Sequence, residues 1–137
     1  TISAAGASLI QGGGLYYTIT DAPLNYYAGA AMFVQDFQTQ YGSTPQSLAA
    51  RVYDATGICL KAIEEASQAK GGTPPTRAEV ARAIRALKDY QGITGIYNFN
   101  NHGDPNPSQY YVYQVVSTDS QNWDQNPVIA SYDITPP

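Results

Sequence analysis

Apolar residues recur at every third or fourth position in three segments of the chain, and this spacing predicts three helices. The segments are residues 25–41, 47–70 and 76–89. Gly42 follows the first segment and the pair Gly71 and Gly72 follows the second, where glycine commonly ends a helix. The third segment opens with Thr76 and, three residues later, Glu79, which is the spacing of a capping box.

Each predicted helix carries one apolar stripe. The stripes consist of Ala30, Phe33, Val34, Phe37 and Tyr41 in the first helix, of Ala55, Ile58, Cys59, Ala62, Ile63 and Ala66 in the second, and of Val80, Ala83, Ile84 and Leu87 in the third. The second helix has its polar residues on the opposite face, so it is predicted to be amphipathic.

Four other segments are rich in β-branched and aromatic residues, which predicts strands. They are residues 15–20, 93–99, 110–116 and 128–134. A turn-rich loop at 100–107 and a polar loop at 118–127 join the last three, which we expect to be antiparallel neighbours. The predicted order is β-α-α-α-β-β-β, and the predicted fold class is α/β.

With 137 residues, the chain fits a single domain. We expect residues 1–14 to form a flexible segment, residues 15–92 to hold one strand and three helices, and residues 93–137 to hold the other strands. The apolar stripes of three helices need more sheet than these strands supply. We therefore expect a partial domain, cut from a longer polypeptide, or a chain that associates with itself.

Charge and composition narrow the class of protein. Charged residues make up 13% of the chain, about half the usual share, and Tyr occurs 12 times. This composition is typical of a secreted or periplasmic protein. The net charge of -4 and the lack of any Lys/Arg cluster argue against a nucleic-acid partner. The single Cys59 excludes an internal disulfide, and neither a membrane span nor an export signal is visible.

No pattern in the sequence predicts catalysis, a metal site or a cofactor. The only histidine, His102, lies in a turn rich in Asn, Gly, Asp and Pro, and no nucleophile and base stand at the spacing of a triad. Asn98, Asn100, His102 and Gln109 occupy positions of a calcium-loop pattern, but His is wrong for calcium and Gln109 is uncharged. We interpret this stretch as a turn.

Three motifs carry a family resemblance: VYDATGICLKAIEEA at 52–66, PTRAEVARAIRAL at 75–87, and GITGIYNFNNHGDPNPSQYYVYQVV at 92–116. Together they resemble the C-terminal region of the branched-chain-amino-acid-type substrate-binding proteins of ABC importers, the Leu/Ile/Val-binding protein family. The resemblance implies a partial lobe of the type I periplasmic binding fold. It also implies that residues 93–137 form the strands of the hinge and of the return to the other lobe.

The resemblance implies a ligand such as an amino acid or another small carboxylate, held between two lobes. The main ligand-holding residues would lie upstream of this chain, so we expect it to bind weakly alone and to add one wall of the cleft. By position, that wall consists of Leu48, Arg51, Tyr53 and Asp54. Tyr53 equally fits a helix-packing role, Arg51 a solvent-facing one, and Asp54 a first-turn acid favoured by the helix dipole.

The resemblance further implies a periplasmic or extracellular location, with a lipid anchor in the parent protein, and a membrane permease as partner. The unpaired apolar stripes predict a homodimer or a strand-exchanged dimer of the chain. A ligand-sensing or protein-interaction module that uses the same α/β segment is the alternative function, and an enzyme is the least favoured one.

Overall fold

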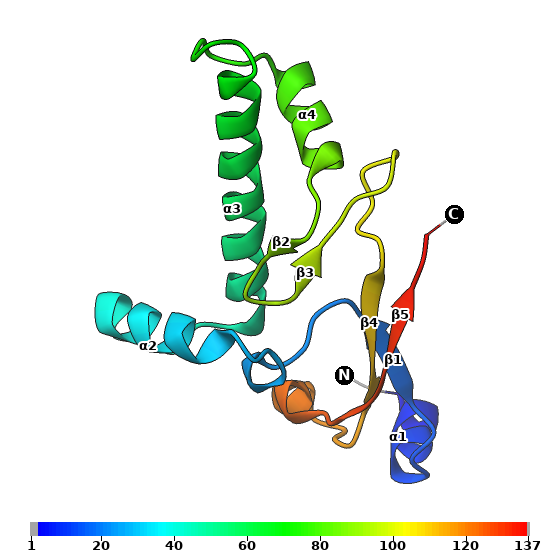
Figure 1. The fold of residues 1–137 in the computed structure, drawn as a ribbon. Coiled ribbons are helices and arrows are strands. Elements are labelled where there is room, and N and C mark those ends of the chain that lie inside the picture. Colours follow the sequence, from blue (N-terminus) through cyan, green and yellow to red (C-terminus); the bar gives the residue numbers. More distant parts are fainter. Residues whose placement is uncertain (1–2, 137) are drawn as a thin grey trace. The chain divides into compact units, whose positions relative to one another are not determined.

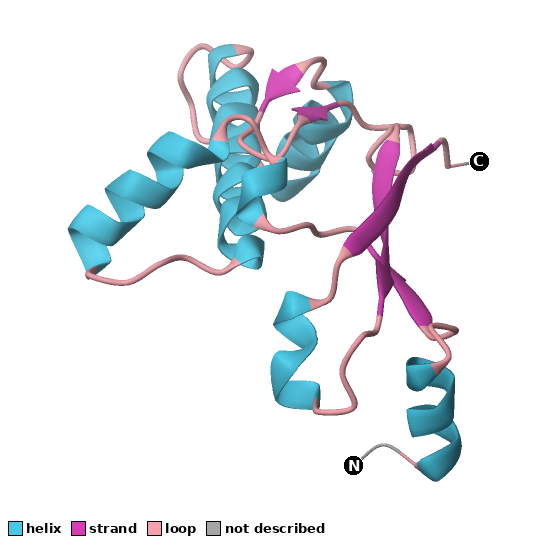
Figure 2. Cartoon of the chain, turned by 90° about the horizontal axis from the view of Figure 1, so that it is seen from below, coloured by secondary structure: helices cyan, strands magenta, loops and turns pink. Residues whose placement is uncertain are grey.

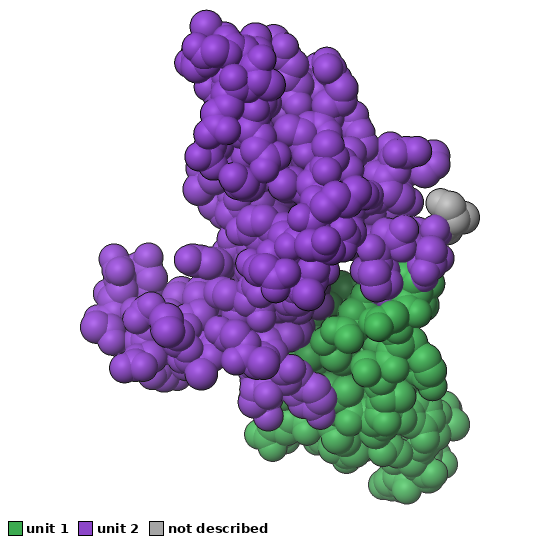
Figure 3. Space-filling model, in the orientation of Figure 1, with its two compact units in different colours: residues 1–22, 109–134 green, residues 23–108, 135–137 purple. Residues whose placement is uncertain are grey.

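The structure, a computed structural model, describes residues 3–136. The chain falls into two compact units, which Figure 3 shows in different colours. One unit comprises residues 1–22 and 109–134, and the other comprises residues 23–108 and 135–137. Each unit is built from segments that are far apart in the sequence, so the chain crosses between the units more than once.

The first unit is organised around a three-stranded sheet, in the order β1-β4-β5. Its strands are β1 (Tyr16–Ile19), β4 (Ser108–Gln114) and β5 (Val128–Ile134), and Figure 2 shows their twist. Strand β1 runs antiparallel to β4 and places Tyr17 opposite Tyr113, whose rings stack with centroids 5.0 Å apart. Tyr111, Tyr113 and Val115 alternate along the chain and are buried, as expected when one face of a strand is covered.

The segment predicted to be flexible, residues 1–14, contains helix α1 (Ala4–Gln11). The side chain of Ser3 accepts a hydrogen bond from the backbone N–H of Gly6 and so caps the helix. Alanine, the best helix former, supplies three of its eight residues, which favours the helix despite the glycine within it. The polar loop predicted at 118–127 also contains a short 3-10 helix, η2 (Ser120–Gln125).

The second unit holds the three predicted helices, with changed bounds (Figure 1). They are α2 (Ala30–Tyr41), α3 (Ser47–Gln68) and α4 (Arg77–Ala86). Helix α2 begins five residues later than predicted, because a 3-10 turn, η1 (Leu24–Tyr26), precedes it and Gly29 occupies its N-cap. Gly42 ends α2 with a φ of 68°, the left-handed conformation expected at that position.

Helix α3 buries a row of residues at every fourth position, and this row faces α4 and the turn at 92–95. The row consists of Ala50, Asp54, Ile58, Ala62 and Ala66. Three of the residues predicted for the buried face, Ala55, Cys59 and Ile63, are instead exposed. The apolar stripe of α3 is wider than the elements that cover it, so only its central row is buried.

Of the strand predicted at 93–99, only β3 (Ile96–Tyr97) is a strand, and it pairs antiparallel with β2 (Tyr90–Gln91), which precedes the predicted range. The expectation that this segment neighbours the strand at 110–116 is wrong, because β2 and β3 form a sheet of their own. Gly92 and Gly95 form the turn between them, where the N–H of Gly92 donates to the carbonyl of Gly95. Gly95 has a φ of 148°, which favours glycine. The observed order of elements therefore differs from the predicted one by an added N-terminal helix, by two 3-10 helices and by the additional strand β2.

Candidate functional site

A groove of about 710 Å³ lies between α2 and α3, within the second unit. Aromatic and aliphatic side chains form most of its wall, and the turn after α2 also contributes to the lining. The lining residues are Phe33, Asp36, Phe37, Gln40, Tyr41, Ser43, Thr44, Pro45, Gln46, Leu48, Ala49, Val52 and Tyr53. This volume lies within the range of pockets that hold small molecules.

Four aromatic rings form a continuous ladder along the groove. The rings of Tyr53 and Phe33 lie 5.4 Å apart, those of Phe33 and Phe37 5.9 Å, and those of Phe37 and Tyr41 4.6 Å. All three pairs are tilted, the arrangement that aromatic rings prefer. Helix α2 supplies three rings at spacings of four residues, so the ladder follows directly from the helical period.

Two of the predicted ligand-binding residues, Leu48 and Tyr53, lie in this groove. Their side chains are 59% and 60% exposed, so both could contact a ligand. Tyr53 also contacts Phe33, which gives it the helix-packing role considered as its alternative.

The other two predicted residues are not among those that line the groove. The guanidinium of Arg51 lies 5.8 Å from the centre of the Tyr27 ring, and its Nη2 donates a hydrogen bond of 3.3 Å to the Tyr27 hydroxyl. Arg51 is therefore half-buried against the segment that precedes α2.

Asp54 is 1% exposed and joins α3 to the turn at 92–95. Its carboxylate accepts hydrogen bonds from the N–H of Ile93 (2.7 Å), the N–H of Thr94 (2.8 Å) and the hydroxyl of Thr94 (2.7 Å). A Cβ on Gly92 would come within 2.7 Å of the Asp54 carboxyl, so only glycine fits at that position. Asp54 thus fixes the position of the turn through its bonds.

The hydrogen bonds of Asp54 form part of a polar cluster whose other residues no sequence pattern predicts. The hydroxyls of Thr94 and Tyr97 share a hydrogen bond of 2.5 Å, which extends the network into β3. Burial and, less strongly, the negative charge of Asp54 raise the pKa of Tyr90. The Tyr90 hydroxyl lies where a Cβ on Gly57 would be, so Gly57 leaves room for this ring within α3.

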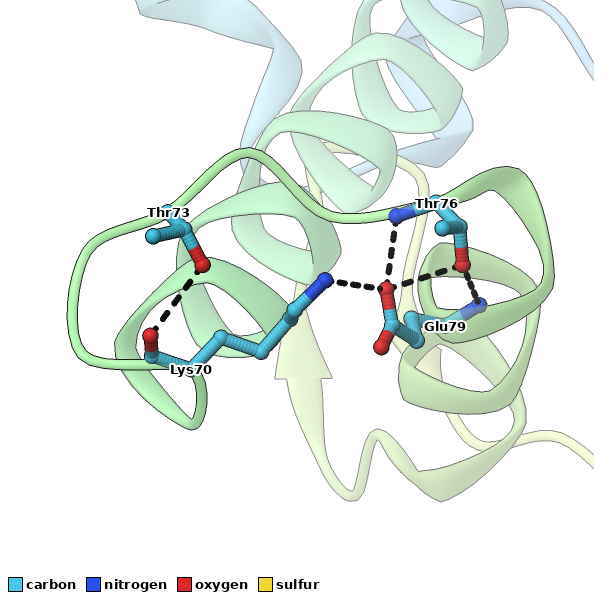
Figure 4. Close-up of polar contacts among 4 residues, drawn as sticks. All are labelled: Lys70, Thr73, Thr76 and Glu79. Carbon is cyan, nitrogen blue, oxygen red and sulfur yellow. Dashed lines mark hydrogen bonds and ion pairs between the residues drawn. The ribbon is translucent and has the colours of Figure 1, made fainter.

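Helix α4 begins with a capping box (Figure 4). Glu79 accepts hydrogen bonds from the N–H (2.7 Å) and the hydroxyl (2.8 Å) of Thr76, and Lys70 lies 3.0 Å from the same carboxylate. The bonds from Thr76 and from Lys70 lower the pKa of Glu79 to about 2. This cluster ties the end of α3 to the start of α4, and the predicted capping box is confirmed.

The loop that contains His102 is a turn, as interpreted from the sequence. The side-chain oxygen of Asn100 accepts hydrogen bonds from the N–H groups of His102 and Asp104, both 2.9 Å. Among residues 3–136, no three His, Cys, Asp or Glu side chains gather closely enough to hold a metal ion. Within the same residues, no helix combines the length and the apolar character that crossing a membrane requires.

Comparison with known proteins identifies the family. A family model described as periplasmic binding protein matches residues 1–121. The leucine-binding protein LivK from Thermotoga maritima has 27% identity and a TM-score of 0.62, over 96% of this chain and 35% of that one. No match was found among the curated proteins.

Two further solved structures are similar. An ABC transporter substrate-binding protein from Desulfitobacterium hafniense, in complex with Leu, has 27% identity and a TM-score of 0.54, over 73% of this chain and 28% of that one. A solute-binding protein from R. palustris, in complex with benzoate, has 17% identity and a TM-score of 0.58, over 98% of this chain and 34% of that one. At that identity the last likeness shows the fold alone.

The chain spans about a third of the length of each of these solved structures. The predicted fold, an α/β partial lobe of the type I periplasmic binding fold, is confirmed. The chain belongs to the periplasmic binding protein family.

Proposed function

We propose that the chain contributes to the extracytoplasmic solute-binding component of an ABC importer, with amino acids or related small carboxylates as ligands. The match of residues 1–121 to the periplasmic binding protein family carries this proposal. Two relatives at 27% identity support the ligand class, because one is named a leucine-binding protein and the other is a complex with Leu. A membrane permease is the partner that this function requires.

Within that component, we assign residues 15–92 to a lobe and residues 93–137 to the hinge and return strands. Leu48 and Tyr53 form the proposed cleft wall, supported by their exposure in the groove. Arg51 and Asp54 then act on the wall indirectly, because their side chains join α3 to neighbouring segments.

The isolated chain is expected to bind its ligand weakly. A solute-binding protein gains affinity when the ligand bridges two lobes and so favours the closed state. The chain spans about a third of its solved relatives, so it supplies a part of such a clamp. Calorimetry of the isolated chain against a panel of amino acids should show no binding at micromolar concentration or tighter, and tight binding would contradict this part of the proposal.

Uptake tests the importer function directly. Deleting the gene that encodes the chain should lower the uptake of radiolabelled leucine, isoleucine or valine, and wild-type complementation should restore it. Complementation with Leu48→Asp should restore less uptake, because a carboxylate in the cleft wall would repel a carboxylate ligand. Unchanged uptake across the panel would contradict the proposal.

The alternative is a ligand-sensing or protein-interaction module. Its support is the exposed apolar surface of α3, which includes Val52, Leu60 and Ile63. The deletion strain separates the two functions, since loss of a sensor would change a transcriptional or behavioural response while uptake stayed normal. In either function the proposed location is periplasmic or extracellular, with a lipid anchor in the parent protein.

A further inference from the structure

The groove between α2 and α3 combines aromatic walls with the negative charge of Asp36. Two residues of its aromatic ladder, Tyr41 and Tyr53, are 65% and 60% exposed to solvent. Aromatic ring faces are negative at their centres and attract cations at distances up to about 6 Å. The walls of the groove therefore favour a ligand that presents both apolar surface and positive charge.

The charged lining of the groove favours the same kind of ligand. Asp36 is its only charged lining residue, and neither Lys nor Arg lines it. The salt bridges and hydrogen bonds formed within residues 3–136 do not include the Asp36 side chain, so its carboxylate is free to pair with a ligand. Asp36 lies one turn before Gln40 and three residues after Phe33, so it stands beside the aromatic ladder on the same helix.

From these observations, we infer that the α2–α3 groove binds small organic ammonium compounds. The ammonium pairs with Asp36 and lies over the rings of the ladder, while the apolar part of the ligand covers Leu48 and Val52. The neutral polar side chains of Ser43, Thr44 and Gln46, which also line the groove, supply hydrogen-bonding groups without opposing this charge.

This inference does not rest on the proposed importer function, but it competes with the assignment of Leu48 and Tyr53 to a wall that faces a carboxylate ligand, because both side chains line this groove. Leucine and benzoate, the ligands named for two solved relatives, both carry a carboxylate, and the groove holds no cation to pair with one. The groove lies within one compact unit of the chain, so its binding can be measured on the isolated chain. Failure of the uptake assay would therefore not contradict this inference, and failure of the ligand titrations would not contradict the importer function.

Three ligands of nearly equal size isolate the effect of charge: 2-phenylethylamine, 2-phenylethanol and 3-phenylpropionate. Because the groove is open and the ligands are small, we expect affinities near the millimolar range. The amine should bind about 3- to 10-fold more tightly than the alcohol, since a partly exposed ion pair and a cation–π contact each add a modest factor. The carboxylate should bind more weakly than the alcohol.

Titrations followed by NMR of the aromatic side chains measure all three affinities in the isolated chain. The shifts should concentrate on Phe33, Phe37, Tyr41 and Tyr53. Asp36→Asn should abolish most of the preference for the amine while leaving the affinity for the alcohol unchanged. Phe37→Ala should lower the affinity for all three ligands. The matched control Asp133→Asn, which removes an exposed carboxylate elsewhere in the chain, should leave the preference intact.

Three results would overturn the inference. The first is carboxylate binding as tight as that of the amine, and the second is the absence of ligand-dependent shifts at the groove. The third is an equal loss of amine preference in Asp36→Asn and Asp133→Asn, which would show that only the net charge matters. Unchanged thermal unfolding of both exposed-site variants would establish that each is folded.

Discussion

A carboxylate buried without a cation must be held by hydrogen bonds, and Asp54 is held in this way. Two backbone N–H groups and one hydroxyl donate to it, all from Ile93 and Thr94. Bonds to an ionised acceptor are stronger than neutral ones, so they offset the desolvation of the charge. The turn at 92–95 consequently depends on Asp54 for its position against α3.

Replacing Asp54 with Asn should destabilise the chain by about 2–4 kcal/mol, because the amide carries one acceptor oxygen and turns a donor toward backbone donors. The free energy of unfolding in urea measures this loss. Asp133→Asn, at an exposed position, is the control and should change the free energy by less than about 0.5 kcal/mol. A loss below about 1 kcal/mol for Asp54→Asn would show that the turn is held by other contacts.

Glu79 makes a pH-dependent contribution whose sign follows from its pKa. The pKa falls from 4.5 to about 2 in the folded chain, because Thr76 and Lys70 bond to the ionised form. A lowered folded pKa gives stability that is present above the unfolded pKa and is lost as the pH falls toward the folded pKa. The stabilisation from Glu79 should therefore be complete above about pH 5 and decline between pH 4.5 and 2.

Urea unfolding of the wild type and of Glu79→Gln across this pH range tests the prediction. The wild type should be more stable at pH 6, and the difference should shrink as the pH approaches 2. A difference that stays constant from pH 6 to pH 2 would mean that the side chain acts through its shape alone.

The sequence predicted only part of the candidate site, and the reason lies in sequence separation. The family resemblance implies that Leu48 and Tyr53 belong to a wall of the cleft between two lobes, which stays a prediction; both residues line the groove between α2 and α3. The partners of Asp54 lie 39 and 40 residues further along the chain, where no local pattern links the two segments. The role of Asp36 was missed because an isolated acid on a helix is usually just solvated.

Among the helices and strands, those whose apolar residues recur at one regular spacing were predictable from the sequence, whereas segments of irregular backbone were not. Helix α3 lies within its predicted range, 47–70, and β5 has the predicted bounds, 128–134. The hairpin of β2 and β3 was not predicted because the β-branched residues Ile93 and Thr94 occupy its turn, where Gly92 and Gly95 are the local signs of reversal. Helix α1 was not predicted because its glycine, its small residues and the three glycines that follow it suggested flexibility.

Gly57 offers a test of how closely α3 packs against β2. Alanine in a helix interior normally adds up to about 1 kcal/mol of stability over glycine. Here the new Cβ would overlap the Tyr90 hydroxyl, so Gly57→Ala should instead destabilise the chain by about 1–2 kcal/mol. In a Tyr90→Phe background the hydroxyl is absent, and the same substitution should become neutral or stabilising.

Chemical denaturation of the wild type, both single variants and the double variant measures this coupling. A reversal in the effect of Gly57→Ala between the two backgrounds would support the packing described. If the substitution has the same effect in both, the Tyr90 ring is free to move away from α3.

The packing of the molecule leaves several apolar side chains exposed, and one group of them lies along α3. Leu60 and Ile63 are 63% and 42% exposed, and Cys59 beside them is exposed as well. Contiguous apolar surface on a monomer usually marks a contact with another protein. In a family-length relative, further chain could cover this face, whereas the isolated chain has only a second copy of itself to do so.

The isolated chain should therefore dimerise at micromolar concentration through the α3 surface. Light scattering should report about twice the mass of 14.7 kDa, and Leu60→Glu should shift the population to monomer because it places a charge in the interface. Gln68→Glu adds the same charge at an exposed position at the end of α3, so it is the matched control and should leave the dimer intact.

Mild oxidation should cross-link the wild type through Cys59 if the two α3 surfaces face each other. A dimer that persists in Leu60→Glu without cross-linking would point to strand exchange instead, and a monomer in the wild type would contradict association altogether.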